Sequence, residues 1–270
     1  MPSPVHLHAD WDGPPPSGRP VIVLLHGFSG DATTWDALRP ALREWGSTLA
    51  IDLLGHGRSP VPARPGPYAL KPCLAQLAAV LKRLEIGRAW WLGYSMGGRV
   101  ALQMAVHRPG LVAGLVLESA SPGLAEPEER AARVRADGEL AAFIEREGVA
   151  AFAARWGALP LFAGLKRLPP ERLAALEAQR LRNDPAGLAN ALRGLGTGVM
   201  PSAWEALGRV RAPTLLLAGA EDAKFLALNR RMAAAIPGST LRVVAGAGHN
   251  IHAERPDAFT AEVLDFLPND

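Results

Sequence analysis

Runs of consecutive apolar residues alternate along the chain with segments whose apolar residues recur every three or four positions. The run Val21–Leu25 is β-branched or aliphatic throughout, which is typical of a parallel strand buried on both faces. Between Leu74 and Leu84, the apolar residues form one stripe along a helix. Alternating strands and helices predict an α/β fold, a mostly parallel sheet with helices on both faces. The predicted strands are 21–25, 49–52, 89–92, 115–118, 214–217 and 241–244.

This alternation stops between Ser121 and Glu205. The stretch is rich in Ala, Glu, Arg and Leu and is interrupted by prolines, which predicts a set of short helices. Because it lies between two predicted strands, we expect it to cover the carboxyl ends of the sheet, where ligands bind in open α/β folds. The predicted organisation is a core made of residues 1–120 and 206–270, with a helical cap of residues 121–205 inserted between them.

A single serine, Ser95, lies between Gly93 and Gly97, after an apolar run and before a helical one. At such a strand-to-helix turn the serine backbone is strained, and small neighbours allow the close approach of chain segments that presents the hydroxyl in a pocket. This nucleophile elbow predicts an acid after a later strand and a histidine later still. Asp222 and His249 occupy those places in the chain.

The three residues have complementary chemical roles. A serine hydroxyl is a poor nucleophile and a poor base unless an imidazole takes its proton and a carboxylate holds that imidazole in the right tautomer. We therefore predict that Ser95, Asp222 and His249 form a catalytic triad. Two alternatives stay open, because Glu221 could supply the carboxylate and His252 the imidazole. We interpret Glu221 as a solvated charge and His252 as a loop or supporting residue.

Two backbone amides are candidates for an oxyanion hole. A tetrahedral or enolate oxyanion needs at least two N–H donors aimed at it. Met96 follows the elbow serine at the start of a helix, and Phe28 lies in the turn after the first strong strand. We expect these two amides to face Ser95.

Composition excludes several classes of partner. The 29 basic and 26 acidic residues give a net charge of +3 without a long basic run, so we expect no nucleic-acid partner. No eighteen apolar residues run together and the N-terminus lacks the features of a signal peptide, which favours a cytoplasmic protein with no membrane partner. With Cys73 alone, no cysteine-based metal cluster can form. We expect neither a metal nor a cofactor, and a monomer or small homo-oligomer.

Together these motifs resemble the α/β-hydrolase superfamily over nearly the whole chain. Within it, they resemble the menaquinone-pathway lyases that eliminate pyruvate from 2-succinyl-5-enolpyruvyl-6-hydroxy-3-cyclohexene-1-carboxylate to give 2-succinyl-6-hydroxy-2,4-cyclohexadiene-1-carboxylate. The resemblance implies a cap inserted after the sixth strand and a triad that abstracts a proton. On this interpretation His249 activates Ser95, which removes a ring proton while the enolpyruvyl group leaves. The matching segments are His26–Asp31, Gly93–Arg99, Asp222–Phe225 and Gly248–His252.

The implied partner is a small-molecule polycarboxylate. Three carboxylates on one substrate call for arginines in a desolvated pocket, because Arg donates two parallel hydrogen bonds to a carboxylate. Arg99 lies one helical turn after Ser95, so we expect it to point into the same pocket. The resemblance implies four further substrate-binding residues, which are Tyr94, Arg133, Trp156 and Arg180.

Two other functions fit part of the sequence. A carboxylic-ester hydrolase would use the same triad and oxyanion hole for acyl transfer and would need no arginine cluster. A binding or receptor protein of this fold would use no chemistry, and the complete triad disfavours it. The sequence therefore favours the lyase, with the ester hydrolase as the alternative.

Overall fold

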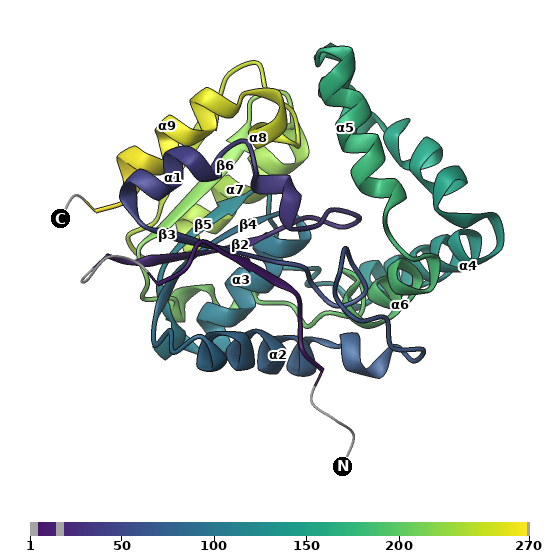
Figure 1. The fold of residues 1–270 in the computed structure, drawn as a ribbon, viewed down its shortest axis with the longest axis horizontal. Helices are drawn as coiled ribbons and strands as arrows, with labels where there is room; N and C mark the ends of the chain where they lie inside the picture. The colour runs from purple at the N-terminus through teal and green to yellow at the C-terminus, as the bar shows by residue number, and fades with distance from the viewer. Residues whose placement is uncertain (1–4, 15–18, 269–270) are drawn as a thin grey trace.

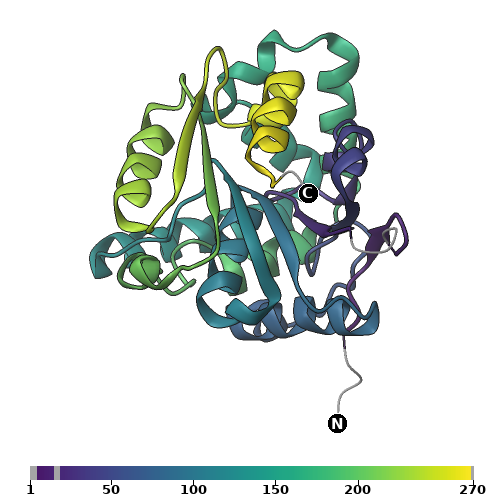
Figure 2. The same cartoon turned by 90° about the vertical axis from the view of Figure 1, so that its left-hand side faces the viewer.

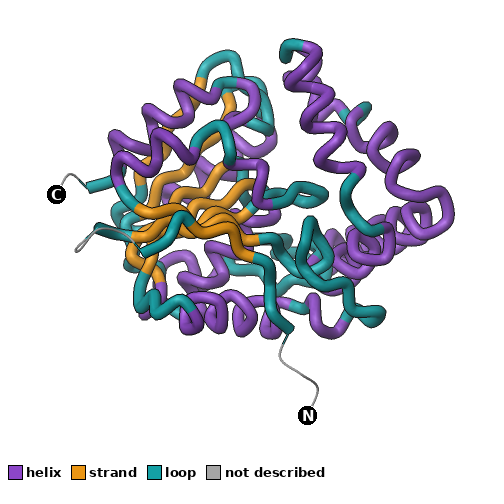
Figure 3. Tube along the Cα trace, viewed as in Figure 1, coloured by secondary structure: helices purple, strands orange, loops and turns teal. Residues whose placement is uncertain are grey.

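A twisted sheet forms the centre of the computed structural model, which describes residues 5–14 and 19–268 (Figures 1 and 3). In these residues the sheet has seven strands in the order β1-β3-β2-β4-β5-β6-β7. Strand β1 runs antiparallel to β3, and all other neighbours are parallel. The strands are β1 (Ala9–Trp11), β2 (Val21–Leu25), β3 (Ser47–Ile51), β4 (Ala89–Tyr94), β5 (Val112–Glu118), β6 (Thr214–Gly219) and β7 (Thr240–Val244).

The mostly parallel α/β architecture predicted from the sequence is confirmed. All six predicted strands are present, and their ends differ from the expected ones by at most three residues. The antiparallel strand β1 was missed. It has three residues, all only partly buried, so it is too short to show an alternating apolar pattern.

Helices cover both faces of the sheet (Figure 2). The side chains of each central strand alternate between two apolar cores, one on each face. In β2, Val23 and Leu25 join one core, whereas Ile22 and Leu24 join the other. Helices α2, α3 and α7 cover the first face, and α1, α8 and α9 cover the second. The helices are α1 (Arg39–Trp45), α2 (Leu70–Arg83), α3 (Met96–His107), α7 (Ala223–Ala235), α8 (Ile251–Glu254) and α9 (Pro256–Phe266).

Helices α4, α5 and α6, with the 3-10 helix η4, lie to one side of the sheet, and we call them the cap helices (Figure 1). They follow β5, which is the fifth strand in the described residues rather than the sixth, because only β1 precedes β2 there. A proline begins each of them, where its missing N–H costs nothing. They are α4 (Pro127–Gly157), η4 (Pro160–Arg167), α5 (Pro170–Leu181) and α6 (Pro185–Leu195).

The cap helices have a small apolar core of their own, which continues into the turn after β2. Phe152 of α4 and Leu188 of α6 are fully buried in it, and Phe28 of the turn packs against it. The rings of Phe28 and Phe152 meet edge to face with their centroids 5.7 Å apart. The residue that we expect to supply one oxyanion donor is therefore also the apolar link between sheet and cap helices.

Four short 3-10 helices complete the described chain, and they are η1 (Ala32–Trp35), η2 (Gly66–Tyr68), η3 (Pro109–Leu111) and η5 (Trp204–Arg209). Across residues 5–14 and 19–268, no single helix is long and apolar enough to cross a membrane. One bent pair, α4 with η4, passes that test by length and composition alone, with an angle of 80° between its members.

Helix α4 is longer than the short helices that the sequence predicted, and it bends at Gly148. It spans 31 residues, and Gly148 has φ 81° and ψ 173°, a conformation open in practice only to glycine. The bend turns the end of the helix so that Trp156 reaches the cavity described below. A glycine here therefore helps to position a residue of the site.

Two glycines of α4 provide a matched test of this bend. We expect Gly148→Ala to lower the free energy of unfolding by about 1–3 kcal/mol, the usual range for a strained backbone. Gly138 is helical and nothing lies within 4 Å of an added Cβ, so Gly138→Ala should raise stability by about 0.5–1 kcal/mol. Denaturant unfolding measures both, and equal effects of the two substitutions would contradict the role of the bend.

Candidate active site

Ser95 occupies the sharp turn between β4 and α3. Its φ of 50° and ψ of −103° lie in a region that side chains rarely adopt. Its N–H donates to the carbonyl of Glu118 at 2.9 Å, which ties the turn to the end of β5. A Cβ on Gly97 would lie 2.2 Å from the carbonyl oxygen of Leu25, so only glycine lets α3 pass this close to β2. The glycine spacing therefore allows the packing that raises the hydroxyl.

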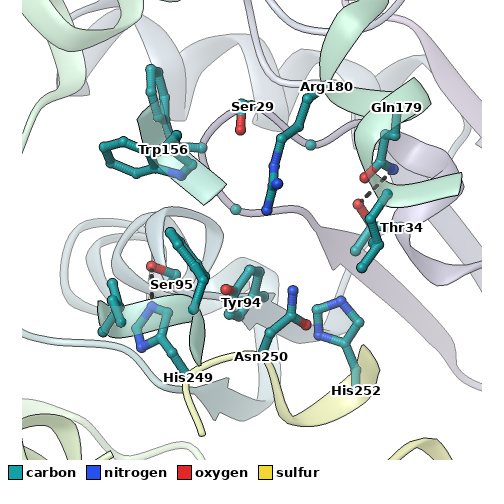
Figure 4. Close-up of a pocket in the computed structure, with 16 residues that line it drawn as sticks. Ser29, Thr34, Tyr94, Ser95, Trp156, Gln179, Arg180, His249, Asn250 and His252 are labelled. Atoms are coloured by element: carbon teal, nitrogen blue, oxygen red, sulfur yellow. Dashed lines mark hydrogen bonds between the residues drawn. The ribbon is translucent and has the colours of Figure 1, made fainter. Parts of the chain in front are cut away.

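Asp222, His249 and Ser95 form a continuous hydrogen-bonded chain, of which Figure 4 shows the bond between His249 and Ser95. The carboxylate can only accept, so Nδ1 of His249 donates to Asp222 Oδ2 at 2.7 Å. This leaves Nε2 of His249 to accept from the Ser95 hydroxyl, with 3.1 Å between the two atoms. Asp222 also accepts the N–H of Phe225 at the start of α7, which fixes its orientation. The arrangement can withdraw a proton from Ser95 and thereby generate a nucleophile or a base.

Glu221 and His252, the two alternative members of the triad, contact other residues. Glu221 is about half exposed and pairs with Arg167 at 2.7 Å, as a solvated charge would. His252 is buried, and its Nδ1 bonds the carboxylate of Glu118 at 2.8 Å. Neither Glu221 nor His252 takes the place of Asp222 or His249 in the hydrogen-bonded chain to Ser95.

The amides of Phe28 and Met96 are available as donors. Neither N–H has a hydrogen-bond acceptor within residues 5–14 and 19–268. They follow the neighbouring parallel strands β2 and β4, whose last paired residues are Leu25 and Gly93. Both amides therefore emerge at the same edge of the sheet, beside Ser95, where an oxyanion could form.

A small cavity lies beside Ser95, between the ends of the strands and the cap helices (Figure 4). Its volume is about 70 Å³, whereas pockets for drug-sized ligands have roughly 300–1,000 Å³. A groove of about 570 Å³ runs alongside it, between η1 and α5. The two spaces share Thr34, Leu176, Gln179 and His252. A larger ligand therefore requires the cap helices to shift or must extend into the groove.

The cavity contains three of the residues expected to bind substrate. Tyr94, Trp156 and Arg180 line it, and Arg180 reaches down from α5 toward Tyr94 (Figure 4). Arg180 has no carboxylate partner in the part of the chain that the structure describes, and it lies 5.6 Å from the centre of the Phe162 ring. Burial lowers the pKa of Arg180 and raises that of Tyr94 well above its usual value. Arg180 is thus a cation without a counterion beside Ser95.

The other two expected arginines do not line the cavity. Arg99 donates to the hydroxyl of Thr197 at 2.6 Å, and burial lowers its pKa to about 10. Arg133 pairs with Asp137 one turn along α4, at 2.7 Å. Helical spacing puts Arg99 on the same side of α3 as Ser95, but its guanidinium turns to Thr197, in the segment after α6.

Polar residues at the end of α5 hold the cap helices on the core. Arg182 forms an ion pair with the buried Asp31 at 2.7 Å, and Gln179 donates to Asp31 at 2.9 Å. Gln179 also donates to Thr34 at 3.0 Å (Figure 4). Because the 29–34 segment follows Phe28 directly, these contacts also hold the turn that carries one candidate oxyanion donor. We call this set of contacts the α5 contact.

Comparison with known proteins agrees with this geometry. The alpha/beta hydrolase family matches residues 22–263, most of the chain. The chain belongs to the alpha/beta hydrolase family. In this family, the chain is 38% identical over 264 residues to 2-succinyl-6-hydroxy-2,4-cyclohexadiene-1-carboxylate synthase of Salmonella agona, covering 97% of each protein. The synthase of the same name from Serratia proteamaculans is 37% identical over 252 residues, which is 93% of this chain and 94% of that protein.

A solved structure of the family is also similar. MenH from S. aureus superimposes with a TM-score of 0.92 at 34% identity, over 96% of this chain and 97% of the other. The predicted resemblance to this group of hydrolase-fold synthases is therefore confirmed. Among the described residues of this alpha/beta hydrolase, no group of three or more His, Cys, Asp or Glu side chains could hold a metal ion.

Sequence reasoning missed the α5 contact and the pocket residues Gln179 and Asn250. Gln179 is an ordinary polar residue in a helix, and only the packing of α5 on the core brings it to Asp31. Asn250 had one signal, since it directly follows His249 in a glycine-rich loop. Both depend on contacts between segments that lie far apart in the chain.

The α5 contact predicts a specific pH dependence of stability. Burial alone would raise the pKa of Asp31, but hydrogen bonds from Thr33, Arg182 and Gln179 hold it below its usual value. A carboxylate with a lowered pKa stabilises the fold above its unfolded pKa of about 3.9, and this contribution is lost as pH falls through the folded pKa. The stability advantage of wild type over Asp31→Asn should therefore shrink as the pH is lowered from about 5 toward 2.

Asp36→Asn is the matched control, measured by denaturant unfolding at constant ionic strength. Burial raises the pKa of Asp36, so its charged form is disfavoured in the folded state. Wild type should gain stability relative to Asp36→Asn as pH falls, the opposite trend. If the two variants showed the same trend, the assigned role of the α5 contact would be wrong.

Proposed function

We propose that this alpha/beta hydrolase eliminates pyruvate from 2-succinyl-5-enolpyruvyl-6-hydroxy-3-cyclohexene-1-carboxylate, giving 2-succinyl-6-hydroxy-2,4-cyclohexadiene-1-carboxylate. The observation that carries the proposal is the Arg180 guanidinium, which lies without a carboxylate partner among the described residues in the cavity beside Ser95. A simple ester substrate has no need of such a cation, whereas a polycarboxylate does. The names of the similar synthases give the same reaction product.

In the proposed reaction Ser95 acts as a base rather than as an acylated nucleophile. His249 Nε2 takes the proton of the Ser95 hydroxyl, and Asp222 stabilises the resulting imidazolium. The serine oxygen removes a ring proton of the substrate, the electron pair forms a new C=C bond, and the C–O bond to the enolpyruvyl group breaks. The released enolpyruvate takes up, at carbon, the proton carried by the His249 imidazolium, which gives pyruvate and restores the neutral imidazole.

Charge builds up on the substrate during this step. The free amides of Phe28 and Met96 are placed to stabilise an enolate oxygen, because both emerge at the sheet edge next to Ser95. Ser95 itself lies at the start of α3, where the positive end of the helix dipole favours an alkoxide. These groups lower the energy of the anionic state without needing a metal ligand.

We propose that the cap of residues 121–205 supplies the substrate-binding part of the site. Trp156 and Arg180 enter the cavity from α4 and α5, and Tyr94 enters it from β4. Arg99 and Arg133 bond Thr197 and Asp137 and lie outside this cavity, so their predicted role in substrate binding stays a prediction. A cytoplasmic location, a monomeric or small homo-oligomeric state and the absence of nucleic-acid or membrane partners stay predictions.

The decisive assay measures pyruvate. Substrate generated in situ from isochorismate and 2-oxoglutarate should release pyruvate when the wild-type protein is added. Ser95→Ala should lower the rate by roughly 10²–10⁴-fold, because it removes the positioned base. If wild type released no pyruvate but hydrolysed small neutral esters through an acyl-serine, the ester-hydrolase alternative would replace this proposal.

Arg180→Ala tests the recognition of carboxylate. It should lower kcat/KM about 10- to 100-fold, mostly by raising KM, because a charge-assisted hydrogen bond is worth about 1.5–3 kcal/mol. Arg135→Ala is the matched control, since Arg135 is exposed on α4 and lies outside the cavity. Equal kinetics for the two variants would remove Arg180 from substrate binding.

A further inference from the structure

A second carboxylate–imidazole pair lies in the site beside the first one. Glu118, at the end of β5, is fully buried, and His252 of α8 is 5% exposed. Both Glu118 oxygens lie within hydrogen-bond distance of Nδ1 of His252, at 2.8 and 3.0 Å, and one of them also accepts the backbone N–H of His252 at 3.0 Å. The proposed elimination step uses neither residue.

The free edge of the His252 ring faces the substrate space. His252 lines both the cavity beside Ser95 and the adjoining groove, and its ring meets that of Tyr94 edge to face at 4.9 Å. Nε2 has no hydrogen-bond partner in the described residues, yet it keeps some accessible surface. In Figure 4 His252 lies next to Asn250 and across from Thr34. Its ring thus connects buried Glu118 with the place where a ligand would bind.

Net charge decides which atom of this pair carries a proton. In residues 5–14 and 19–268, His252 is the only ionisable residue that hydrogen-bonds the Glu118 carboxyl group. A carboxylate beside a neutral imidazole would leave a full negative charge buried, which is costly. The pair can avoid this as carboxylate and imidazolium, or as carboxylic acid and neutral imidazole. In both forms the proton on Nε2 is present and points away from Glu118.

In the Asp222–His249 pair, Nε2 of the imidazole is an acceptor rather than a donor. Each carboxylate accepts one backbone N–H, but Asp222 is the N-cap residue of α7, a helix of 13 residues, whereas the N–H bonded to Glu118 belongs to the four-residue helix α8. The dipole of the longer helix partly compensates the charge of Asp222 without protonation of the imidazole. Nε2 of His249 is therefore free to accept from Ser95. The Asp222–His249 pair can thus act as a base, and the Glu118–His252 pair can act as a hydrogen-bond donor in the same cavity.

We propose that His252, positioned by Glu118, donates its Nε2–H to a carboxylate of the substrate and so forms a second anion-binding group together with Arg180. This assignment rests on the proposed polycarboxylate lyase function. It explains why a buried glutamate lies at the end of β5 without an arginine or lysine partner among the described residues. Arg180 supplies charge from the cap helices, and His252 supplies a fixed donor from the core.

Three substitutions separate this role from a structural one. In His252→Asn, the side-chain amide can take the place of Nδ1 and keep the bond to Glu118, but nothing replaces Nε2. In His252→Gln, the longer side chain can bring its amide N–H to the place of Nε2. Glu118→Gln removes the buried charge but keeps the hydrogen bonds: its oxygen can accept the backbone N–H of His252, and its amide N–H can donate to Nδ1, so the neutral imidazole keeps its proton on Nε2.

The kinetic expectations follow from the donor at Nε2. His252→Asn should raise KM for the elimination by roughly 10- to 100-fold with a smaller change in kcat, since a hydrogen bond to a charged group is lost, whereas Glu118→Gln keeps a donor at Nε2 and should raise KM less. His252→Gln should recover part of this loss. His107→Asn is the control, because His107 is exposed at the end of α3, and its kinetics should match wild type. Unchanged KM in folded His252→Asn would overturn the proposal.

NMR of the wild-type protein tests whether Nε2 of His252 carries a proton, and it needs no turnover of substrate. With ¹⁵N-labelled histidine, the Nε2 of His252 should appear protonated in the wild-type protein. Addition of succinate should shift the His252 signal, and the uncharged succinamide should not. An unprotonated Nε2 in wild type, or no response to succinate, would overturn the proposal whatever the variants do.

The two proposals can fail separately. If succinate shifts the His252 signal but no pyruvate is released from the substrate, the anion-binding group stands and the lyase function falls. If pyruvate is released normally while His252 neither carries the proton nor responds to succinate, the lyase function stands and this inference falls.

Discussion

The close contact between α3 and β2 is the constraint on which the site depends. Gly97 lies so near the carbonyl of Leu25 that any side chain would collide with it, and this contact forces the turn before α3 into the strained conformation of Ser95. The strain is stable because every residue of β2 and β4, and every residue of β5 except Ala113, is buried and cannot relax. Every other functional group is placed relative to this turn.

The parallel sheet brings the remaining groups to the same edge. Strands β4, β5 and β6 end side by side, so the residues that follow or end them, Ser95, Glu118 and Asp222, lie in adjacent positions. The loop after β7 and helix α8 then carry His249 and His252 back over that edge. The result is two carboxylate–imidazole pairs around one small space, with different charge compensation and therefore different proton positions.

The cap helices close this space from above and are tied to it at the turn after β2. Phe28 packs into their apolar core, and the α5 contact joins Gln179 and Arg182 to Asp31. Phe28 also carries a candidate oxyanion donor, so a shift of the cap helices would move this donor as well. The small volume of the cavity indicates that ligand entry requires this contact to give way or the adjoining groove to be used.

By itself, the sequence determined the strand and helix order and the three residues around Ser95. Those features are local: buried strands are continuous apolar runs, and a nucleophile elbow requires glycines at fixed spacing. Only the tertiary structure decided that Arg180 reaches the cavity while Arg99 turns to Thr197, and that His252 pairs with Glu118. The direction of a long side chain depends on which partner lies within reach, and residues nearly a hundred or more positions away supply that partner.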